Sequence, residues 1–440
     1  MKNSRPADRQ LQRDKTYKTG KILQKSNKPI EKEEEKPSFS AKLLNQANIE
    51  RKTGKFDCTT EIEPLADFPY EKELLLKNRV FREFWKENNL PLSPENIVPS
   101  PKPRNYRTTT KRRVIKIKGR FFLVFSEEAR GLSQETFTPS LLEPEEHSRI
   151  YRYLVERINE PTYSIIGHNL NFLIIRGSYS EFSVIFNVHS LTGAVVNKIK
   201  AVSAELKNSG VNVISAFIYL DPTRSDYYLE NIRPVDQVNF KKIFGPDKLF
   251  VRFHDKKYSF YPTSFSQVNE SMVPVMLDNA KQMLLPADEN RFIDLYCGYG
   301  LFSHFLADYF TETLGIEAEG SSIKSAIENS QFISHKGKIR FLAKRITSES
   351  LEDILPDNDL TGEVYLLDPP RQGTEKGVIK TIALREPAKL LHIFCNVDRI
   401  ARETAEWKKN GYKIQKVLPL DMFPGTPNLE VMILLVPYTH

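Results

Sequence analysis

Short apolar runs alternate with helix-like stretches over residues 256–440, and this order predicts the fold of that region. Repeated strand–helix–strand crossovers are right-handed and build a parallel, doubly wound sheet with helices on both faces. The last two runs are joined by a loop with no room for a helix, so they should pair as an antiparallel hairpin. The expected strands are Phe292–Tyr296, Thr313–Glu317, Ile339–Leu342, Val364–Asp368, Leu390–Cys395, Ile414–Leu420 and Val431–Val436. The pattern therefore predicts an α/β, Rossmann-like domain over residues 256–440.

Residues 61–255 have a mixed pattern that predicts a separate α+β domain. Over residues 70–88, Phe81 and Trp85 recur at helical spacing and indicate an amphipathic helix. Lys77 and other basic residues can lie outside this apolar stripe. Two further helices are expected at about 143–158 and 194–208, and the expected strands are Val114–Ile117, Phe121–Phe125, Phe172–Ile175, Phe182–Val188 and Val213–Leu220.

Residues 1–60 are predicted to form a disordered basic arm. Residues 1–55 hold 15 Lys or Arg against 7 Asp or Glu, whereas the other 385 residues hold 49 of each sign. The arm has few large apolar residues and no hydrophobic period, so burial cannot offset the entropy lost on ordering. A basic arm on a neutral body suits contact with a phosphate backbone, although a solvated tail that aids solubility explains the same charge.

A second basic stretch, residues 102–118, opens the central domain and surrounds Tyr106. Phosphates favour cations and unstacked bases favour aromatic faces, so this composition suits an RNA surface. A charged edge strand, protected from aggregation, is the structural alternative.

Composition narrows the class of protein. Apolar residues make up 40% of the chain, yet no run approaches the ~20 apolar residues that span a membrane, and the N-terminus has no secretory signal. The three cysteines, Cys58, Cys297 and Cys395, allow no disulfide framework and no four-cysteine metal site. We therefore expect a cytoplasmic protein with no metal, no membrane partner and no obligate protein partner.

A glycine-rich turn follows the first expected strand of the C-terminal domain. Gly298 and Gly300 let the backbone approach a ligand closely at the end of that strand. Glu317 comes nineteen residues after Gly298, at the end of the next strand, where an acid can accept both hydroxyls of an adenosine ribose. Phe302 stands where a dinucleotide site would have its third glycine. The pattern favours a single nucleoside over a dinucleotide, although an ordinary tight turn remains open.

Three further strand ends carry polar chemistry. Asp368 is followed by two prolines that fix the exit path of the chain, and then by Arg371. Cys395 ends another apolar run, beside the same crevice. A cysteine in a strand is usually a small core residue, but here a thiolate nucleophile is possible. Glu430 opens the last strand and is either a surface glutamate or a general base whose pKa burial raises.

Taken together, these motifs resemble the RNA 5-methyluridine (uracil-C5) methyltransferase family, whose members methylate uridine in tRNA or rRNA. The resemblance is most specific from Phe265 to Glu430 and weaker over residues 65–255. The motifs that carry it are Phe265-Ser266-Gln267-Val268-Asn269, Asp294-Leu295-Tyr296-Cys297-Gly298-Tyr299-Gly300, Asp368-Pro369-Pro370-Arg371, Cys395-Asn396 and Asp421-Met422-Phe423-Pro424 followed by Glu430. The family implies a class I methyltransferase fold with the predicted C-terminal hairpin, and S-adenosylmethionine as cofactor.

The resemblance also implies roles for particular residues. It makes Cys395 the nucleophile and Glu430 the base, with RNA as the partner. The cofactor contacts that it implies are Gln267, Tyr296, Glu317 and Asp368. The chemistry agrees, because carbon 5 of uracil becomes nucleophilic only after a thiolate has added to carbon 6.

The sequence departs from the family in three respects. The N-terminal β-barrel and the iron–sulfur cysteines of many members have no counterpart, and Cys58 stands alone near the expected cluster position. Phe394 and Val397 flank Cys395-Asn396 where the family usually has serine and proline, which leaves the RNA target open. Two alternatives remain: methylation of cytosine carbon 5, which also needs a cysteine, and a noncatalytic RNA-binding protein on the same fold.

Overall fold

The computed structural model describes residues 37–53, 63–125, 136–225, 239–285, 291–355 and 362–438. Residues 38–440 form one compact unit, and the description below concerns this unit. Most of the segment predicted to be a disordered arm, namely residues 1–36 and 54–60, lies outside the described residues.

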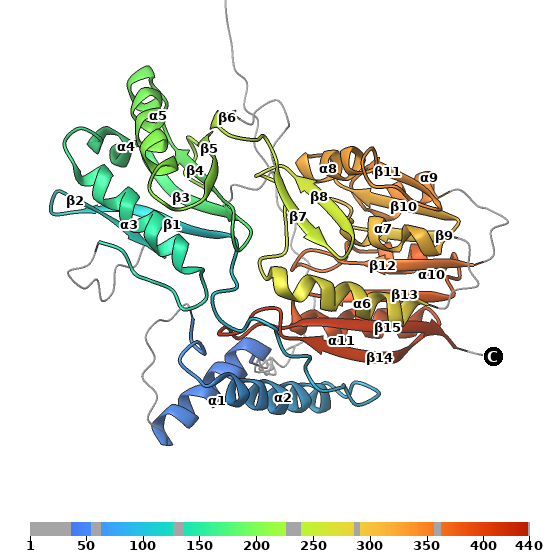
Figure 1. Cartoon of the computed structure of the whole chain (residues 1–440). Coiled ribbons are helices and arrows are strands. Elements are labelled where there is room, and N and C mark those ends of the chain that lie inside the picture. The colour runs from blue at the N-terminus through green and yellow to red at the C-terminus, as the bar shows by residue number, and fades with distance from the viewer. Residues whose placement is uncertain are drawn as a thin grey trace, which may run out of the picture. The chain divides into compact units, whose positions relative to one another are not determined.

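The C-terminal domain is built on a seven-stranded sheet with the order β11-β10-β9-β12-β13-β15-β14 (Figure 1). Neighbours among β9–β13 run parallel, whereas β15 is antiparallel to both β13 and β14. The doubly wound α/β sheet and its closing hairpin are as predicted. The strands are β9 (Arg291–Leu295), β10 (Glu312–Glu317), β11 (Lys338–Ala343), β12 (Glu363–Leu367), β13 (Lys389–Phe394), β14 (Tyr412–Leu420) and β15 (Glu430–Pro437).

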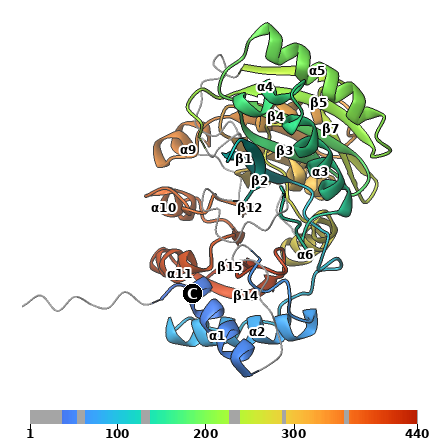
Figure 2. The ribbon, with the colours of Figure 1, turned by 90° about the vertical axis from the view of Figure 1, so that its left-hand side faces the viewer.

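Helices cover both faces of this sheet because successive apolar side chains along its strands point to opposite faces, and both faces must be buried. Figure 2 shows α9, α10 and α11 along one face and α6 on the other. Ile293 and Tyr365 belong to the core under the first face, and Phe292 and Val364 to the core under the second. The helices are α6 (Val273–Leu284), α7 (Leu301–Leu306), α8 (Ser321–Asn329), α9 (Ser348–Ile354), α10 (Val378–Ala383) and α11 (Ile400–Lys409), with short 3-10 turns η2 (Glu270–Met272), η3 (Ala307–Tyr309) and η4 (Val397–Arg399).

The central region contains a second sheet with the order β2-β1-β3-β4-β5-β6, which is antiparallel except for the pair β4–β5. Its helices pack on one face around a core that includes Leu154, Phe186 and Val202. The elements are β1 (Thr110–Ile117), β2 (Arg120–Val124), α3 (Glu145–Asn159), α4 (Ser164–Asn169), β3 (Leu170–Gly177), β4 (Phe182–Val188), α5 (Gly193–Lys207), β5 (Val213–Leu220) and β6 (Asn239–Phe244). A hairpin of β7 (Leu249–Phe253) and β8 (Lys256–Phe260) precedes the C-terminal domain.

Two helices, α1 (Phe39–Thr53) and α2 (Tyr70–Glu87), contribute to the core of the C-terminal domain. The expectation of disorder is therefore wrong for residues 39–53. Phe39, Leu43 and Ala47, spaced by one helical turn, are buried, and the Phe39 ring meets Phe81 and Phe84 of α2 edge-on at 6.0 Å. Burial against α2 supplies the stabilisation that the composition of the segment does not indicate.

Across the described ranges, no helix is both long and apolar enough to cross a membrane.

Candidate active site

The predicted site residues follow the carboxyl ends of four neighbouring strands. Tyr296 follows β9, Glu317 ends β10, Asp368 follows β12 and Cys395 follows β13. Since β9 lies between β10 and β12, the chain leaves β9 in one direction and returns on its other side, and ligands of open α/β sheets bind at such a switch point.

The antiparallel strand β15 brings a fifth residue to this edge. Phe394, the last residue of β13, pairs with Val431 in β15. The preceding residue of β15, Glu430, therefore lies beside Cys395, the residue after Phe394. This register explains how two side chains 35 positions apart meet at one end of the sheet.

The glycine-rich turn has the backbone that a closely bound ligand requires. Tyr296, Gly298 and Gly300 have φ values of 64°, 57° and 83°, in the left-handed region that favours glycine. A β-carbon at Gly300 would approach His304 Cδ2 to 2.8 Å, whereas the corresponding position at Gly298 faces open space. Gly298 thus leaves room for a ligand against the turn.

Glu317 holds this turn in place. Its carboxylate accepts hydrogen bonds from the N–H of Gly298 at 3.0 Å and of Ala318 at 2.8 Å. Burial raises the pKa of Glu317, and the two N–H donors oppose that rise. The acid that the nineteen-residue spacing singled out does contact the glycine turn.

Two aspartates near the crevice, Asp294 and Asp368, also have raised pKa values. Asp294, in β9, is fully buried and accepts a hydrogen bond from the Ser303 hydroxyl of α7. Burial raises the pKa of Asp294 to about 7. Burial, with the neighbouring charge of Glu317, likewise raises the pKa of Asp368 to about 7. Such clusters of perturbed acids are typical of functional sites.

The Cys395 thiol is half-buried, and its sulfur lies 3.8 Å from the carbonyl oxygen of Pro369. Burial and the charges of Glu430 and Asp368 raise the pKa of the thiol, while the Arg371 guanidinium lowers it. The free protein therefore keeps the thiol protonated, and Arg371 is the cation that favours the thiolate.

Glu430 is only 2% exposed. Burial and the charge of Asp368 raise its pKa well above the ordinary value, and Arg371 again opposes the rise. A buried carboxylate in this setting takes up a proton readily, which is the property that a general base needs.

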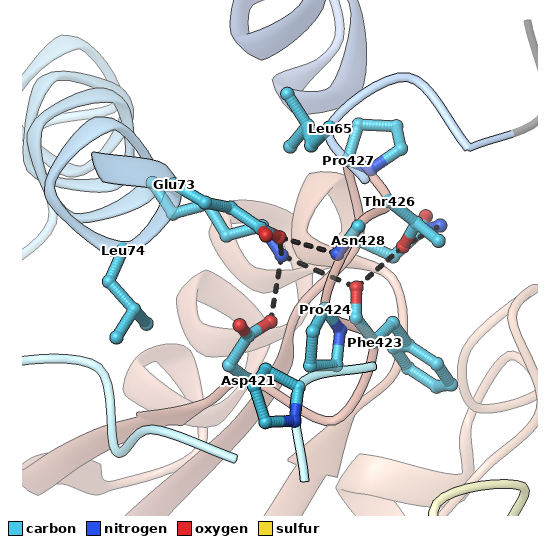
Figure 3. A network of polar contacts seen from close by, with 12 residues as sticks. Leu65, Glu73, Leu74, Asp421, Phe423, Pro424, Thr426, Pro427 and Asn428 are labelled. Atoms are coloured by element: carbon cyan, nitrogen blue, oxygen red, sulfur yellow. Dashed lines mark hydrogen bonds and ion pairs between the residues drawn. The ribbon is translucent and has the colours of Figure 1, made fainter. Parts of the chain in front are cut away.

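An ion-pair network holds the loop that leads to Glu430. Lys77 Nζ lies 2.7 Å from an Asp421 carboxylate oxygen, 2.8 Å from Glu73, and 3.3 Å from the carbonyl oxygen of Phe423. Glu73 also accepts a hydrogen bond from the N–H of Gly425. Figure 3 shows Glu73 of α2 and Asp421 and Phe423 of the loop around this network. The expectation that Lys77 lies outside the apolar stripe is wrong, because the side chain is fully buried.

Gln267 is the predicted cofactor contact that the structure ties least closely to the others. Gln267 is half-buried, and within the described residues it makes no hydrogen bond with the other predicted site residues. Its segment is anchored nearby, since the amide of Asn269 donates to the carbonyl oxygen of Met422 at 3.1 Å, and Arg176 donates to Ser266 at 2.7 Å.

The structure adds residues that the sequence analysis did not single out. A cavity of about 160 Å³ opens beside Cys395, and its walls include Arg371, Asn428 and two residues of α1, Phe39 and Ser40. The one sequence signal for α1 is the spacing of Phe39, Leu43 and Ala47, which the surrounding charge obscures.

Sheet order, hairpin and crevice define a class I methyltransferase fold. Residues 235–437 match the model of the tRNA (uracil-5-)-methyltransferase family. The resemblance drawn from the motifs is thereby confirmed.

The chain is also similar in sequence to RNA methyltransferases and in structure to a solved one. An uncharacterised RNA methyltransferase of Thermosynechococcus vestitus is 33% identical over 182 residues, which cover 41% of this chain and 39% of that relative. The chain thus spans about two-fifths of the length of this relative. An uncharacterised RNA methyltransferase of Clostridium tetani is 24% identical over 85% of this chain and 80% of its own.

The tRNA (uracil-54, C5)-methyltransferase of Pyrococcus abyssi, solved with S-adenosyl-L-homocysteine, superposes with a TM-score of 0.62 at 20% identity, over 85% of each chain. This likeness shows the same fold. The expected cofactor, S-adenosylmethionine, is in keeping with the family and with this neighbour.

Proposed function

We propose that the chain transfers a methyl group from S-adenosylmethionine to carbon 5 of a uridine in rRNA or tRNA, through a covalent adduct with Cys395. The observation that carries this proposal is the pairing of Phe394 with Val431, which sets a thiol and a buried carboxyl side by side at the switch-point crevice.

The crevice fits a nucleoside cofactor. Gly298 offers open space against its backbone, and Glu317 and Asp368 present carboxylates at strand ends on either side of β9. We assign Glu317 to the ribose hydroxyls, and Tyr296, Asp368 and Gln267 to the remaining cofactor contacts. When bound there, S-adenosylmethionine supplies the methyl group that carbon 5 receives.

The Cys395 thiol first loses its proton to solvent, and Arg371 favours this loss because it stabilises the thiolate. The thiolate then adds to carbon 6 of the uracil, and the electrons of the carbon 5–carbon 6 double bond move onto the carbon 4 carbonyl as an enolate. After carbon 5 has been methylated, Glu430 removes its proton. The electrons of that carbon–hydrogen bond restore the double bond and expel the thiolate.

We also propose that residues 61–255 recognise the RNA and that the basic residues of the arm add affinity. In the central sheet, Lys111 Nζ and the Arg113 guanidinium carbon lie 4.8 Å and 4.7 Å from the centre of the Phe172 ring. Cations on this face of the sheet suit contact with phosphates, whereas the Phe172 ring itself is buried.

RNA that carries 5-fluorouridine tests the proposal directly. Fluorine cannot leave carbon 5 as a cation, so the wild-type protein with S-adenosylmethionine should form an adduct that survives denaturing electrophoresis. Cys395→Ala should form none, and Cys58→Ser, the control, should form as much as wild type. An adduct that maps to another residue would exclude the mechanism, and an adduct with 5-fluorocytidine RNA instead would identify cytosine as the target.

A further inference from the structure

The cavity beside Cys395 has three walls, which four parts of the chain supply. The loops after β12 and β13 contribute Arg371 and Cys395–Asp398, and the loop before β15 contributes Pro427–Leu429. The third wall is the first turn of α1, with Phe39 and Ser40. This wall comes from far outside residues 235–437, which match the methyltransferase family.

The first turn of α1 is fixed to both of the other walls. The N–H of Phe39 donates to a carboxylate oxygen of Asp398 at 2.8 Å, two residues after Asn396. The Ser40 hydroxyl donates to the carbonyl oxygen of Pro427 at 3.1 Å, three residues before Glu430. The Phe39 ring is 1% exposed and packs against α2. The turn therefore connects the loop that carries the thiol with the loop that carries the base.

The size and chemistry of the cavity indicate what it receives. At about 160 Å³ it is smaller than pockets for drug-sized ligands, which hold about 300–1,000 Å³, and so it suits one small planar base. The polar residues among its walls are Ser40, Arg371, Asn396, Asp398 and Asn428. Side chains of these types can pair with a pyrimidine, which presents carbonyl acceptors and an N–H donor on one edge.

We propose that the first turn of α1 forms one wall of the pocket for the target pyrimidine nucleotide, and that Ser40 is a specificity-determining residue for the RNA. This inference rests on the proposed function, because the pocket is assigned to the target base only if Cys395 is the nucleophile that attacks that base. A larger side chain at position 40 would enter the cavity. One at Ala41, which is exposed and does not line the cavity, would not.

Ser40→Tyr and the matched control Ala41→Tyr test the wall without RNA. Alkylation of Cys395 by iodoacetamide, followed by mass spectrometry of its peptide, reports access to the thiol. Ser40→Tyr should slow alkylation several-fold, and Ala41→Tyr should match wild type. Asp398→Ala, which removes the acceptor of the Phe39 N–H, should speed alkylation because the turn is released. Ser40→Val serves in place of Ser40→Tyr if the latter does not fold.

The same variants then test the role in RNA recognition. Ser40→Tyr should lower kcat/KM for RNA by about tenfold or more, since misplacing a reacting group by about 1 Å can cost a hundredfold, while cofactor affinity stays that of wild type. Wild-type alkylation and wild-type methylation by a folded Ser40 variant would overturn the proposal. If wild type itself does not methylate RNA, the proposed function fails, whereas the alkylation series still decides whether α1 walls the pocket.

Discussion

Lys77 and Asp421 form an ion pair at 2.7 Å in which both side chains are fully buried. The pair joins helix α2 to the loop that leads into β15 and to Glu430. Tyr106 contacts the same loop, since its hydroxyl donates to the carbonyl oxygen of Pro424 at 3.0 Å. The elements before residue 110 thus hold the base-bearing loop of the C-terminal domain.

Removing the lysine should destabilise the protein strongly. Lys77→Met leaves Asp421 buried without its cation, whereas Glu73 keeps its ion pair with Arg104. Breaking a buried pair in this way costs about 3–5 kcal/mol. Urea unfolding followed by circular dichroism measures the decrease in stability. Arg79, on the same helix, forms an exposed ion pair with Glu50. Arg79→Met breaks this pair and should lower the free energy of unfolding by only about 0–1 kcal/mol. Equal midpoints for the two variants would show that the buried network contributes little.

Glu317→Ala should weaken cofactor binding. A charge-assisted hydrogen bond contributes roughly 1.5–3 kcal/mol. The affinity for S-adenosylmethionine, measured by calorimetry, should therefore decrease by a factor of between about ten and somewhat more than a hundred. Glu319→Ala, at an exposed position on the same turn, should bind as wild type. Unchanged affinity in Glu317→Ala would remove this residue from the site.

Much of the fold follows from local pattern. Strands β4 and β5 have the predicted bounds, Phe182–Val188 and Val213–Leu220, because each is rich in β-branched and aromatic residues and is flanked by polar residues. The strand ends that carry Glu317, Asp368 and Cys395 were predictable for the same reason. Parallel strands place their carboxyl ends at one edge, so residues that follow successive strands converge.

What the sequence could not predict depends on distant contacts. The pattern of its own helix predicts that the Lys77 side chain is exposed to solvent. Its burial depends on the ion pair with Asp421, which lies 344 positions later in the chain. Helix α1 has too few apolar residues to fold alone, and becomes stable where Phe39 meets Phe81 and Phe84. Asp421 and helix α2 both lie too far along the chain for a local hydrophobic pattern to identify them as partners.

Deleting residues 2–36 should weaken RNA binding and flatten its dependence on salt, while leaving α1 intact. Residues 1–36 hold 11 Lys or Arg and 6 Asp or Glu. The slope of log affinity against log salt becomes shallower by about 0.7–0.9 for each phosphate that the protein no longer neutralises. Filter binding at several salt concentrations measures this slope, and the modified nucleotide, mapped by mass spectrometry, should not change. A shifted modification site would mean that the arm contributes to specificity.

The reactivity of Cys395 should depend on pH in a way that Glu430 influences. Burial and the charge of Glu430 raise the pKa of the thiol, so alkylation of the free wild-type protein should be slow at neutral pH and rise as the pH rises. Glu430→Gln removes a neighbouring negative charge, which lowers the thiol pKa and moves the alkylation profile to lower pH. An unmoved profile would show that the Glu430 carboxyl is uncharged where the thiol titrates.

Cys395 and Glu430 should also have separable roles in the reaction with ordinary uridine RNA. Cys395→Ala should abolish methylation and keep cofactor affinity, since no cofactor contact is assigned to the thiol. Glu430→Gln should still form the adduct and transfer the methyl group, but it cannot remove the carbon 5 proton. A covalent, methylated protein–RNA species should therefore accumulate and survive denaturing electrophoresis, with label from the methyl group of the cofactor in the same band. Wild type should show no such band, because elimination follows methylation. Free methylated RNA released by Glu430→Gln at the wild-type rate would assign the proton to another base.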